Sequence, residues 1–160
     1  MNDTLAMVTG SFDPFTLGHL SLVARAAAMF SRVCVAVLVN PDKTYMFSVE
    51  ERVALIRKAV AEYPTVSVVA FDGMTTDLAR RLGATCLVRG IRNEADAAYE
   101  AAMAAYNMQH GGVDTICLFC DDMAQVSSGA VRERLAEGLS LEGWMPDSII
   151  AETLAYYRTK

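Results

Sequence analysis

The chain has 160 residues, of which 53% are apolar and 21% are charged, and its formal net charge is −5 at pH 7. A chain of this length and balance can bury one continuous core, so a disordered protein is excluded and a single domain over residues 1–160 is expected. The negative charge excludes non-specific nucleic-acid binding, which needs a surplus of Lys and Arg, but it allows a small anionic ligand held by a local cluster of cations.

Short β-branched runs alternate along the chain with longer amphipathic segments, which is typical of successive βαβ units. The runs are mostly apolar on both faces, as expected for a parallel sheet with helices on both sides. We therefore predict an α/β fold, a single doubly wound, Rossmann-like domain with a five-stranded parallel sheet. The strands are expected at Leu5–Val8, Val33–Val39, Val66–Phe71, Thr85–Val88 and Thr115–Phe119.

Two helices are expected in the first half of the chain. The first carries apolar residues at helical spacing on one face, namely Leu20, Val23, Ala24 and Ala27. The second begins at a capping box, because Ser48 stands three residues before Glu51 and each side chain can bond the other's backbone N–H. Its buried stripe is predicted to consist of Val49, Val53, Ile56 and Val60.

Three further helices are expected in the second half. Asn93 with Asp96 begins a long Ala-rich helix that runs toward His110 and ends at Gly111-Gly112. Ser127 or Ser128 caps a shorter helix that reaches Gly138. Pro146 fits the first turn of a final helix that ends near Tyr157.

Four cysteines lie inside apolar runs: Cys34, Cys86, Cys117 and Cys120. Cys117 and Cys120 form a C-x-x-C, but no second pair or His cluster completes a zinc site, so core packing is favoured over metal or redox chemistry. No apolar run approaches the roughly 20 residues that a membrane-spanning helix needs, and no secretory signal is visible. We expect a cytoplasmic protein with no membrane partner.

The segment from Gly10 to His19 follows the first predicted strand and enters a helical pattern, a junction that binds phosphate well. Gly10 and Gly18 allow the backbone to approach an anion, and Thr16 and His19 are spaced so that both side chains can point toward one ligand. The alternative is that Thr16 is only an N-cap and His19 an ordinary surface or core histidine. The position at the carboxyl end of a strand favours the ligand site, because open α/β sheets bind ligands there.

Gly10–His19 resembles the nucleotidyltransferase superfamily whose signature is H-x-G-H or T-x-G-H, here in its T-x-G-H form. Three further segments narrow the resemblance to the bacterial phosphopantetheine adenylyltransferase family, and each follows a predicted strand. They are Asn40-Pro41-Asp42-Lys43, Arg89-Gly90-Ile91-Arg92-Asn93 with Asp96, Tyr99 and Glu100, and Val126-Ser127-Ser128-Gly129-Ala130-Val131-Arg132-Glu133. The resemblance covers nearly the whole chain.

The basic residues of these segments have physical explanations of their own. Lys43 lies just beyond an apolar strand, where an anion ligand is favoured over a solvated surface lysine. Arg89 ends an otherwise apolar strand, and its planar guanidinium suits phosphate. Arg92 is placed to bind a second phosphate, and a structural ion pair with Asp96 or Glu100 is the alternative.

The resemblance implies transfer of AMP from ATP to 4'-phosphopantetheine, giving dephospho-CoA and pyrophosphate by direct in-line attack without a covalent enzyme intermediate. It implies Mg²⁺ held mainly by ATP phosphates and water, with no metal ligands from the protein, and a homohexamer. Its catalytic residues would be His19, Lys43 and Arg89, and its acceptor-binding residues Ser11, Lys43, Thr75 and Arg89. The ATP-binding residues would be Ser11, Phe12, His19, Gly90, Ile91, Arg92, Glu100, Met123, Ala124, Gln125, Val126, Ser127, Ser128 and Gly129.

Some positions depart from the family pattern or allow a simpler reading. Ser127 and Ser128 can be plain helix caps, although the resemblance favours contacts with the triphosphate. Gly129 stands where the family commonly has a third hydroxyl residue, and Met123 where it often has an aromatic one. Thr75 falls where the family contributes a backbone contact to the pantetheine arm.

Two other classes of function stay open. One is a different enzyme of the superfamily, which adenylylates nicotinamide mononucleotide or transfers CMP to an alcohol phosphate; such relatives usually carry His at the first motif position and lack Arg-Gly-Ile-Arg. The other is a nucleotide-binding regulator without turnover, which would keep the glycines and serines but have no need of His19. A doubly wound domain of unrelated function would leave four motif matches at one sheet edge unexplained.

Overall fold

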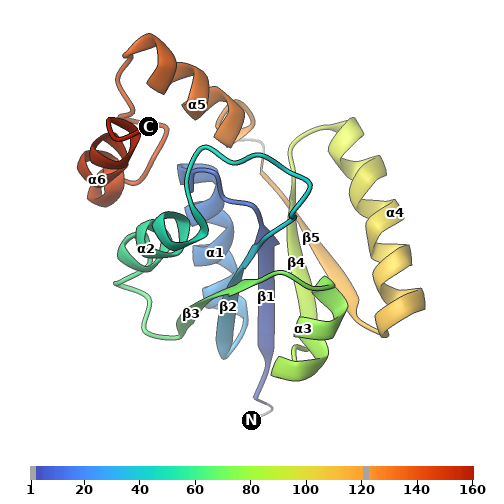
Figure 1. Ribbon diagram of the computed structural model, residues 1–160. Coiled ribbons are helices and arrows are strands. Elements are labelled where there is room, and N and C mark those ends of the chain that lie inside the picture. The colour runs from blue at the N-terminus through green and yellow to red at the C-terminus, as the bar shows by residue number, and fades with distance from the viewer. Residues whose placement is uncertain (1–2, 121–122) are drawn as a thin grey trace.

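The computed structural model describes residues 3–120 and 123–160 and contains one five-stranded parallel sheet (Figure 1). The strand order is β3-β2-β1-β4-β5, so the chain reverses direction across the sheet between β1 and β4. Such a switch point opens a crevice at the carboxyl ends of the two strands. The predicted doubly wound, Rossmann-like fold is confirmed. The strands are β1 Leu5–Gly10, β2 Arg32–Leu38, β3 Val66–Phe71, β4 Cys86–Ile91 and β5 Asp114–Phe119.

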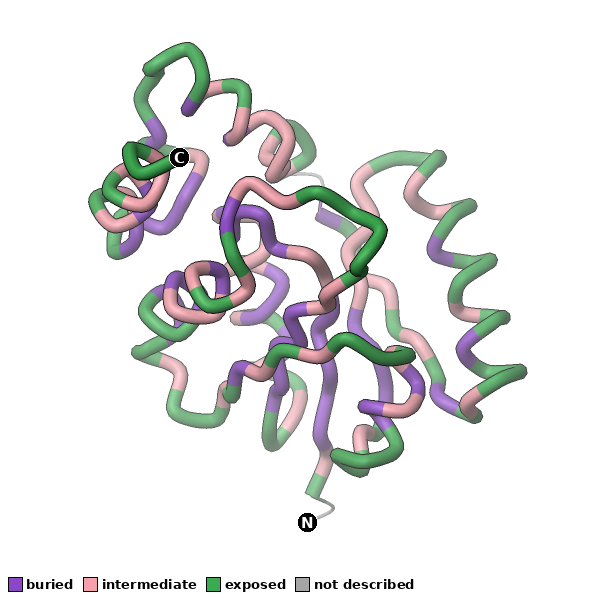
Figure 2. The backbone as a smooth tube through the Cα atoms, viewed as in Figure 1, coloured by how far each residue is buried: buried purple, intermediate pink, exposed green. Residues whose placement is uncertain are grey.

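The predicted strands are all present, and the largest difference is at β4. This strand continues three residues beyond Val88, so Arg89 lies within it and pairs with Cys117 of β5. The central strands are buried (Figure 2), as expected for a sheet with helices on both sides, whereas the edges are less covered and Phe119 of β5 is 72% exposed. An edge strand has one neighbour only and lies less fully under the helices.

Helices cover both faces of the sheet. They are α1 Leu17–Met29, α2 Val49–Ala59, α3 Thr75–Leu82, α4 Glu94–Gly111, α5 Ser128–Glu137 and α6 Asp147–Tyr157. One apolar cluster joins Val8 and Val35 to residues of α1, α2, α5 and α6, and a second joins Met7 and Ala36 to Leu78 of α3. The alternation of side chains along β1 and β2 thus supplies two cores, one on each face.

The predicted helix ends agree well with the structure. Ser48 and Glu51 form the reciprocal capping box of α2, and the Asn93 side chain accepts from the Asp96 N–H at the start of α4. The Ser127 hydroxyl accepts from the Ala130 N–H and caps α5. Gly112 and Gly138 end α4 and α5 with positive φ, a conformation that glycine adopts without a steric penalty.

The predicted buried faces of α1 and α2 are partly wrong. In α1 the buried residues are Leu22, Val23 and Ala26, whereas Leu20, Ala24 and Ala27 are only half-buried. An Ala-rich helix is apolar on more than one face, so periodicity alone does not determine its rotation.

In α2 the buried stripe consists of Arg52, Leu55, Ile56 and Ala59, with Val60 directly after the helix, while Val49 and Val53 flank it. Because Arg52 stands within that stripe, the sequence pattern of this face resembles a polar face, and its burial was not predicted. Helix α3 was not predicted, because Met74 at its N-cap offers no side-chain hydrogen bond and so gives no start signal.

Cys34, Cys86 and Cys120 are buried and Cys117 is half-buried, which supports their assignment to core packing. Burial raises the pKa of the Cys34 and Cys86 thiols, so neither is activated as a thiolate. In residues 3–120 and 123–160, no cluster of three or more His, Cys, Asp or Glu side chains is arranged to hold a metal ion. Of the helices in the same ranges, none is long and apolar enough to cross a bilayer.

Candidate active site

A pocket of about 440 Å³ opens at the carboxyl ends of β1 and β4, at the switch point of the sheet. Its wall is formed by the turn after β1, the first turns of α1 and α4, the end of β4 and the N-terminal end of α5, which approaches this edge of the sheet (Figure 1). Segments far apart in the sequence therefore meet at the edge where ligands of α/β proteins bind.

Most of the predicted site residues line this one pocket. They are Ser11, Phe12, His19, Lys43, Arg89, Gly90, Arg92, Glu100, Met123, Val126, Ser127, Ser128 and Gly129. Ile91, Ala124, Gln125 and Thr75 do not line it. Ala124 and Gln125 are exposed in the turn before α5, and Thr75 is the first residue of α3.

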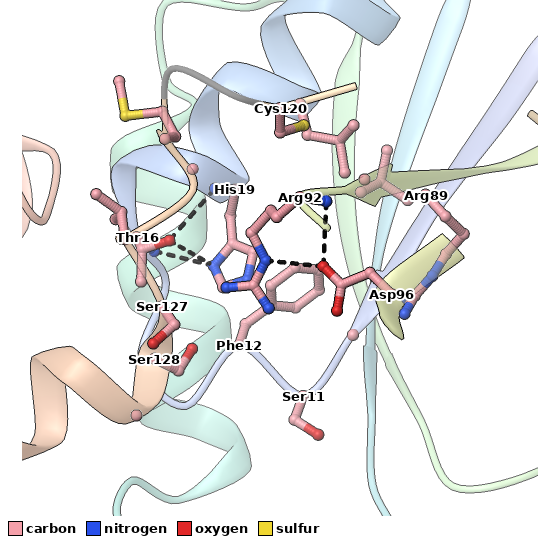
Figure 3. Close-up of a pocket in the computed structure, with 18 of the residues that line it drawn as sticks. Ser11, Phe12, Thr16, His19, Arg89, Arg92, Asp96, Cys120, Ser127 and Ser128 are labelled. Carbon is pink, nitrogen blue, oxygen red and sulfur yellow. Dashed lines mark hydrogen bonds and ion pairs between the residues drawn. The ribbon is translucent and has the colours of Figure 1, made fainter. Parts of the chain in front are cut away.

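His19 is held by Thr16 in a fixed orientation and tautomer. The Thr16 backbone N–H donates to His19 Nδ1 at 3.0 Å, while the Thr16 hydroxyl accepts from the His19 N–H at 3.3 Å (Figure 3). A backbone N–H can only donate, so Nδ1 is the acceptor and the neutral imidazole carries its proton on Nε2. Thr16 is an N-cap, as the alternative reading proposed, and it is buried; its hydroxyl lies 3.1 Å from His19 Nδ1.

The imidazole stays neutral at physiological pH. Burial and, to a smaller extent, the nearby positive charges of Arg89 and Arg92 lower the pKa of His19 from 6.5 to about 3. The rings of Phe12 and Phe15 pack against it, with centroids 4.9 and 5.4 Å away. The site therefore offers a neutral hydrogen-bond donor in a desolvated position.

The turn after β1 is fixed from several sides. The Asp13 carboxylate accepts from the Met46 and Phe47 N–H groups at 2.8 and 2.9 Å, which binds the loop after β2 to this turn. Arg132 Nη1 donates to the Asp13 carbonyl at 2.7 Å, and the Ser128 hydroxyl donates to the Pro14 carbonyl at 2.7 Å. The hydroxyl proton of Ser128 is thus already used within the protein.

Arg89 forms a half-buried ion pair with Glu100. Its Nε is 3.0 Å from both carboxylate oxygens and its Nη2 is 2.7 Å from one of them, while Nη1 donates to the carbonyl and hydroxyl oxygens of Thr9. The Glu100 side chain is only 7% exposed. This pairing places a guanidinium rigidly at the pocket wall, and it was not foreseen, because sequence reasoning proposed carboxylate partners for Arg92 alone.

Arg92 pairs with Asp96, with Nε 3.1 Å from the carboxylate, so the structural ion pair considered as an alternative is present. Lys43 Nζ instead lies 3.4 Å from the Ser11 hydroxyl. In the described part of the chain no carboxylate lies within 4.0 Å of the Lys43 or Arg132 cation. These two cations, which have no acidic partner among the described residues, therefore contribute positive charge that an anionic ligand would meet.

Sequence reasoning missed a role for Arg132, although it lies in a matched segment. It lines the pocket one helical turn beyond Ser128, and a Cβ built on Gly129 would lie 3.7 Å from its Nη2. The guanidinium therefore lies close to the N-terminal end of α5. The sequence did indicate this role, because Arg132 stands four residues after Ser128 and therefore lies on the same side of the helix.

The lining residues include four cations and three carboxylates arranged around a neutral imidazole. In Figure 3 the imidazole lies between Ser127 and Ser128 on one side and Arg92 and Asp96 on the other. Phosphate groups fit such a site, because guanidinium and ammonium donors and helix N–H groups all face one cavity.

Comparisons with known proteins agree with this geometry. The profile of the Cytidylyltransferase-like family matches residues 7–134. The chain is 39% identical over 153 residues to the phosphopantetheine adenylyltransferase of Porphyromonas gingivalis, covering 95% of this chain and 100% of that one. It is 41% identical over 155 residues to that of Streptococcus pneumoniae strain R6, and 37% over 155 residues to that of Streptococcus uberis, covering 95% of this chain and 96% and 93% of theirs.

A solved structure with the same fold is a bifunctional NMN adenylyltransferase/ADP ribose pyrophosphatase from Francisella tularensis, complexed with AMP and a Mn ion. Its TM-score is 0.73 at 14% identity, and the match covers 99% of this chain and 50% of that one. The chain thus spans about half the length of that protein, and the likeness shows the fold.

Proposed function

The chain belongs to the phosphopantetheine adenylyltransferases within the Cytidylyltransferase-like family, and on that premise we propose how its pocket transfers AMP from ATP to 4'-phosphopantetheine. The products are dephospho-CoA and pyrophosphate, a step of coenzyme A biosynthesis. The acceptor phosphate attacks the α-phosphorus directly, in line with the departing pyrophosphate. No protein nucleophile takes part.

The chemistry needs positioning and charge stabilisation more than acid–base catalysis. A phosphate monoester is already an anion at neutral pH, so no general base is required, and the barrier comes from bringing two anions together. The observation that carries the proposal is the neutral His19, whose Nδ1 is bound by the Thr16 N–H. Its Nε2–H is the donor we assign to the α-phosphate as charge develops on it.

We assign the two substrates to two different sets of donors around His19. Lys43 and Arg89, with Ser11, bind the acceptor phosphate, since Lys43 already lies 3.4 Å from the Ser11 hydroxyl. Arg92 and the N-terminal end of α5 bind the triphosphate.

At the α5 end, Ser127 contributes its hydroxyl, and Ser128 and Gly129 contribute backbone N–H groups, since the Ser128 hydroxyl already donates to Pro14. We add Arg132 to this set because it faces the same cavity without a carboxylate partner in the described ranges.

Glu100 has two roles in this proposal. It orients Arg89 through the ion pair, and it also contacts the ribose or adenine of ATP. The two roles are compatible, because a carboxylate has about four lone-pair positions and can accept from a guanidinium and a hydroxyl together.

Mg²⁺ would reach the site with ATP. Among the described residues, the carboxylates that line the pocket already accept from protein donors: Asp13 from backbone N–H groups, Asp96 from Arg92 and Glu100 from Arg89. This donor set supports an ion held mainly by phosphate oxygens and water, which Mg²⁺ tolerates because it keeps much of its hydration. When bound, the ion would neutralise charge on the phosphates of ATP.

We also propose a homohexamer, as the family resemblance implies. Helix α4 buries only Glu100 and Asn107 of its described residues, and it leaves Tyr99, Met103 and Tyr106 exposed. Phe119 of the neighbouring edge strand β5 is exposed as well. An apolar surface of this kind beside an unpaired strand edge supports contact with further copies of the chain.

The assembly is tested by light scattering, which should give a mass of about six times the 17.4 kDa of the chain. Phe119→Glu should dissociate it. Leu139→Glu changes an exposed leucine between α5 and α6 and should not. A wild-type mass of one chain would refute the assembly.

We also propose that the protein is cytoplasmic, because its substrate is ATP and its buried thiols suit a reducing compartment.

The function is tested by a substrate panel with Mg-ATP. Pyrophosphate release is expected with 4'-phosphopantetheine and not with nicotinamide mononucleotide, and CTP with an alcohol phosphate should give no product. If nicotinamide mononucleotide is the only acceptor that is turned over, the chain is instead an enzyme that adenylylates nicotinamide mononucleotide. ATP binding with no turnover on any acceptor would indicate a regulator.

A further inference from the structure

Arg52 is a buried cation to which the proposed reaction assigns no role. It is the fourth residue of α2 and is 1% exposed, less than Asp13 or Glu100. Burial lowers the pKa of its guanidinium from the ordinary value of 12.5. In the described part of the chain no carboxylate lies within 4.0 Å of it. A charge in such a place is retained only if hydrogen bonds replace its water.

Those hydrogen bonds go to backbone carbonyls of two different segments. Arg52 Nη1 donates to the Ser11 carbonyl at 2.7 Å, and Nε donates to the carbonyls of Phe47 and Ser48 at 3.2 and 3.4 Å. The ring of Tyr45 lies 4.1 Å from the guanidinium carbon. One side chain thus joins the turn after β1 to the loop that precedes α2.

The bond to Ser11 determines the orientation of a peptide group at the pocket wall. In a planar trans peptide, the carbonyl of residue 11 and the N–H of residue 12 point in opposite directions. The carbonyl faces Arg52, so the Phe12 N–H faces the other side, where Ser11 and Phe12 line the pocket. This N–H donates to no other residue of ranges 3–120 and 123–160. Phe12 also has φ 51°, a conformation that residues other than glycine seldom adopt without support.

The bonds to Phe47 and Ser48 fix the segment that carries Lys43. The Tyr45 hydroxyl, whose ring packs on the same guanidinium, accepts from the Asn40 N–H at 2.9 Å. Both ends of the loop after β2 are therefore tied to Arg52, directly or through Tyr45. Lys43 lies between them and within 3.4 Å of Ser11.

We propose that Arg52 is a positioning residue of the transfer reaction. Its guanidinium aligns the Phe12 N–H with the α-phosphate and holds Lys43 opposite it on the acceptor phosphate, so that the two reacting groups meet. Arg52 touches neither substrate and acts only through these two donors. This inference rests on the proposed function.

The test compares Arg52→Met with Arg57→Met. Arg57 lies in the same helix, and its guanidinium also donates to a carbonyl, that of Val68 at 3.4 Å, away from the pocket. Both variants are assayed at a temperature where circular dichroism shows them folded. Arg52→Met should lower kcat by about 10- to 100-fold and raise the KM for 4'-phosphopantetheine, with a much smaller change in ATP affinity. Arg57→Met should stay within about twofold of the wild type.

A purely structural role would lower the melting temperature of Arg52→Met but leave kcat and both KM values of the folded enzyme unchanged, and that result would overturn the inference. If Arg52→Met does not fold, Arg52→Lys replaces it. An ammonium keeps the charge but not the planar fork, so its turnover should fall well below that of the wild type. Wild-type turnover in Arg52→Lys would likewise overturn the inference.

Hydrogen exchange gives a readout that does not depend on turnover. Amides of residues 39–47 should exchange faster in Arg52→Met, or in Arg52→Lys, than in Arg57→Met. If the wild type forms no dephospho-CoA, the proposed function fails, and unchanged exchange in the Arg52 variant then overturns the inference separately. If the wild type is active, unchanged kcat and KM values in the Arg52 variant overturn the inference alone, whatever the exchange result.

Discussion

Replacing His19 with alanine should remove most of the catalytic rate while leaving the domain folded. The imidazole donates from Nε2 because Nδ1 is occupied by the Thr16 N–H, and it stays neutral because burial, with the charges of Arg89 and Arg92, lowers its pKa to about 3. Removing one such preorganised donor to a developing oxyanion typically lowers kcat by about 10²- to 10³-fold, or ~3–4 kcal/mol. We expect a loss of that size for His19→Ala.

The loss of stability in this variant should be smaller. The Thr16 N–H loses its acceptor at the start of α1, and the contacts with the rings of Phe12 and Phe15 are lost. These effects together amount to about 2–3 kcal/mol. For a domain of this size the melting temperature should fall by roughly 5–10 °C.

The assay is steady-state pyrophosphate release at 25 °C with saturating Mg-ATP and 4'-phosphopantetheine, together with the Kd for ATP. The control is His110→Ala, which removes the other histidine, exposed near the end of α4 and stacked on Tyr106. His19→Ala should lose kcat with little change in ATP affinity, because the bond is strongest in the transition state. Unchanged turnover in folded His19→Ala would exclude the imidazole from the mechanism, and an equal loss of ATP affinity would assign it to substrate binding.

Three other perturbations test separate parts of the site. Arg89→Ala should raise the KM for 4'-phosphopantetheine more than the KM for ATP, and a selective loss of ATP binding would contradict the assignment. In urea unfolding the variant should be less stable by about 3–5 kcal/mol, because Glu100 is left buried without its partner. Arg132→Gln should weaken the binding of ATP and pyrophosphate by about tenfold in calorimetry, but it should not weaken the binding of dephospho-CoA, which lacks the β- and γ-phosphates of ATP. Equal weakening of all three ligands would argue for a structural role. The pKa of His19 is lower in the folded than in the unfolded chain, so the unfolded state binds more protons and the stability should fall as pH drops from about 6.5 toward 3. Between pH 7 and pH 5 the urea midpoint of His19→Gln should fall less than that of the wild type, and equal falls would refute the pKa shift.

The sequence was sufficient for the features that depend on neighbours along the chain. The capping box of Ser48 and Glu51 and the glycine that ends α4 were predicted because each involves groups within a few residues. The alternation of strands and helices predicted the doubly wound sheet. Ligands of such sheets bind at the carboxyl ends of the strands, so the motif residues were expected to lie together, and most of them line one pocket.

The features that escaped prediction depend on distant partners. Arg52 looks like a solvated residue on the polar face of α2, and only the carbonyl of Ser11, 41 residues away, explains its burial. Arg89 receives its Thr9 contacts from a strand 80 residues away, through β1–β4 pairing that no local pattern specifies. Arg132 escaped for the same reason, since its partner is the Asp13 carbonyl, 119 residues away.

The contact between Thr16 and His19 has a consequence for the order in which the site assembles. Those residues are three apart, so the orientation of the imidazole is complete once the first turn of α1 has formed. The acceptor side depends on Lys43, Arg89 and Arg52, which adopt their positions only when remote segments have packed together. Local melting of the loop after β2 should therefore abolish acceptor capture while the histidine keeps its geometry, and 4'-phosphopantetheine should protect that loop from proteolysis better than ATP does.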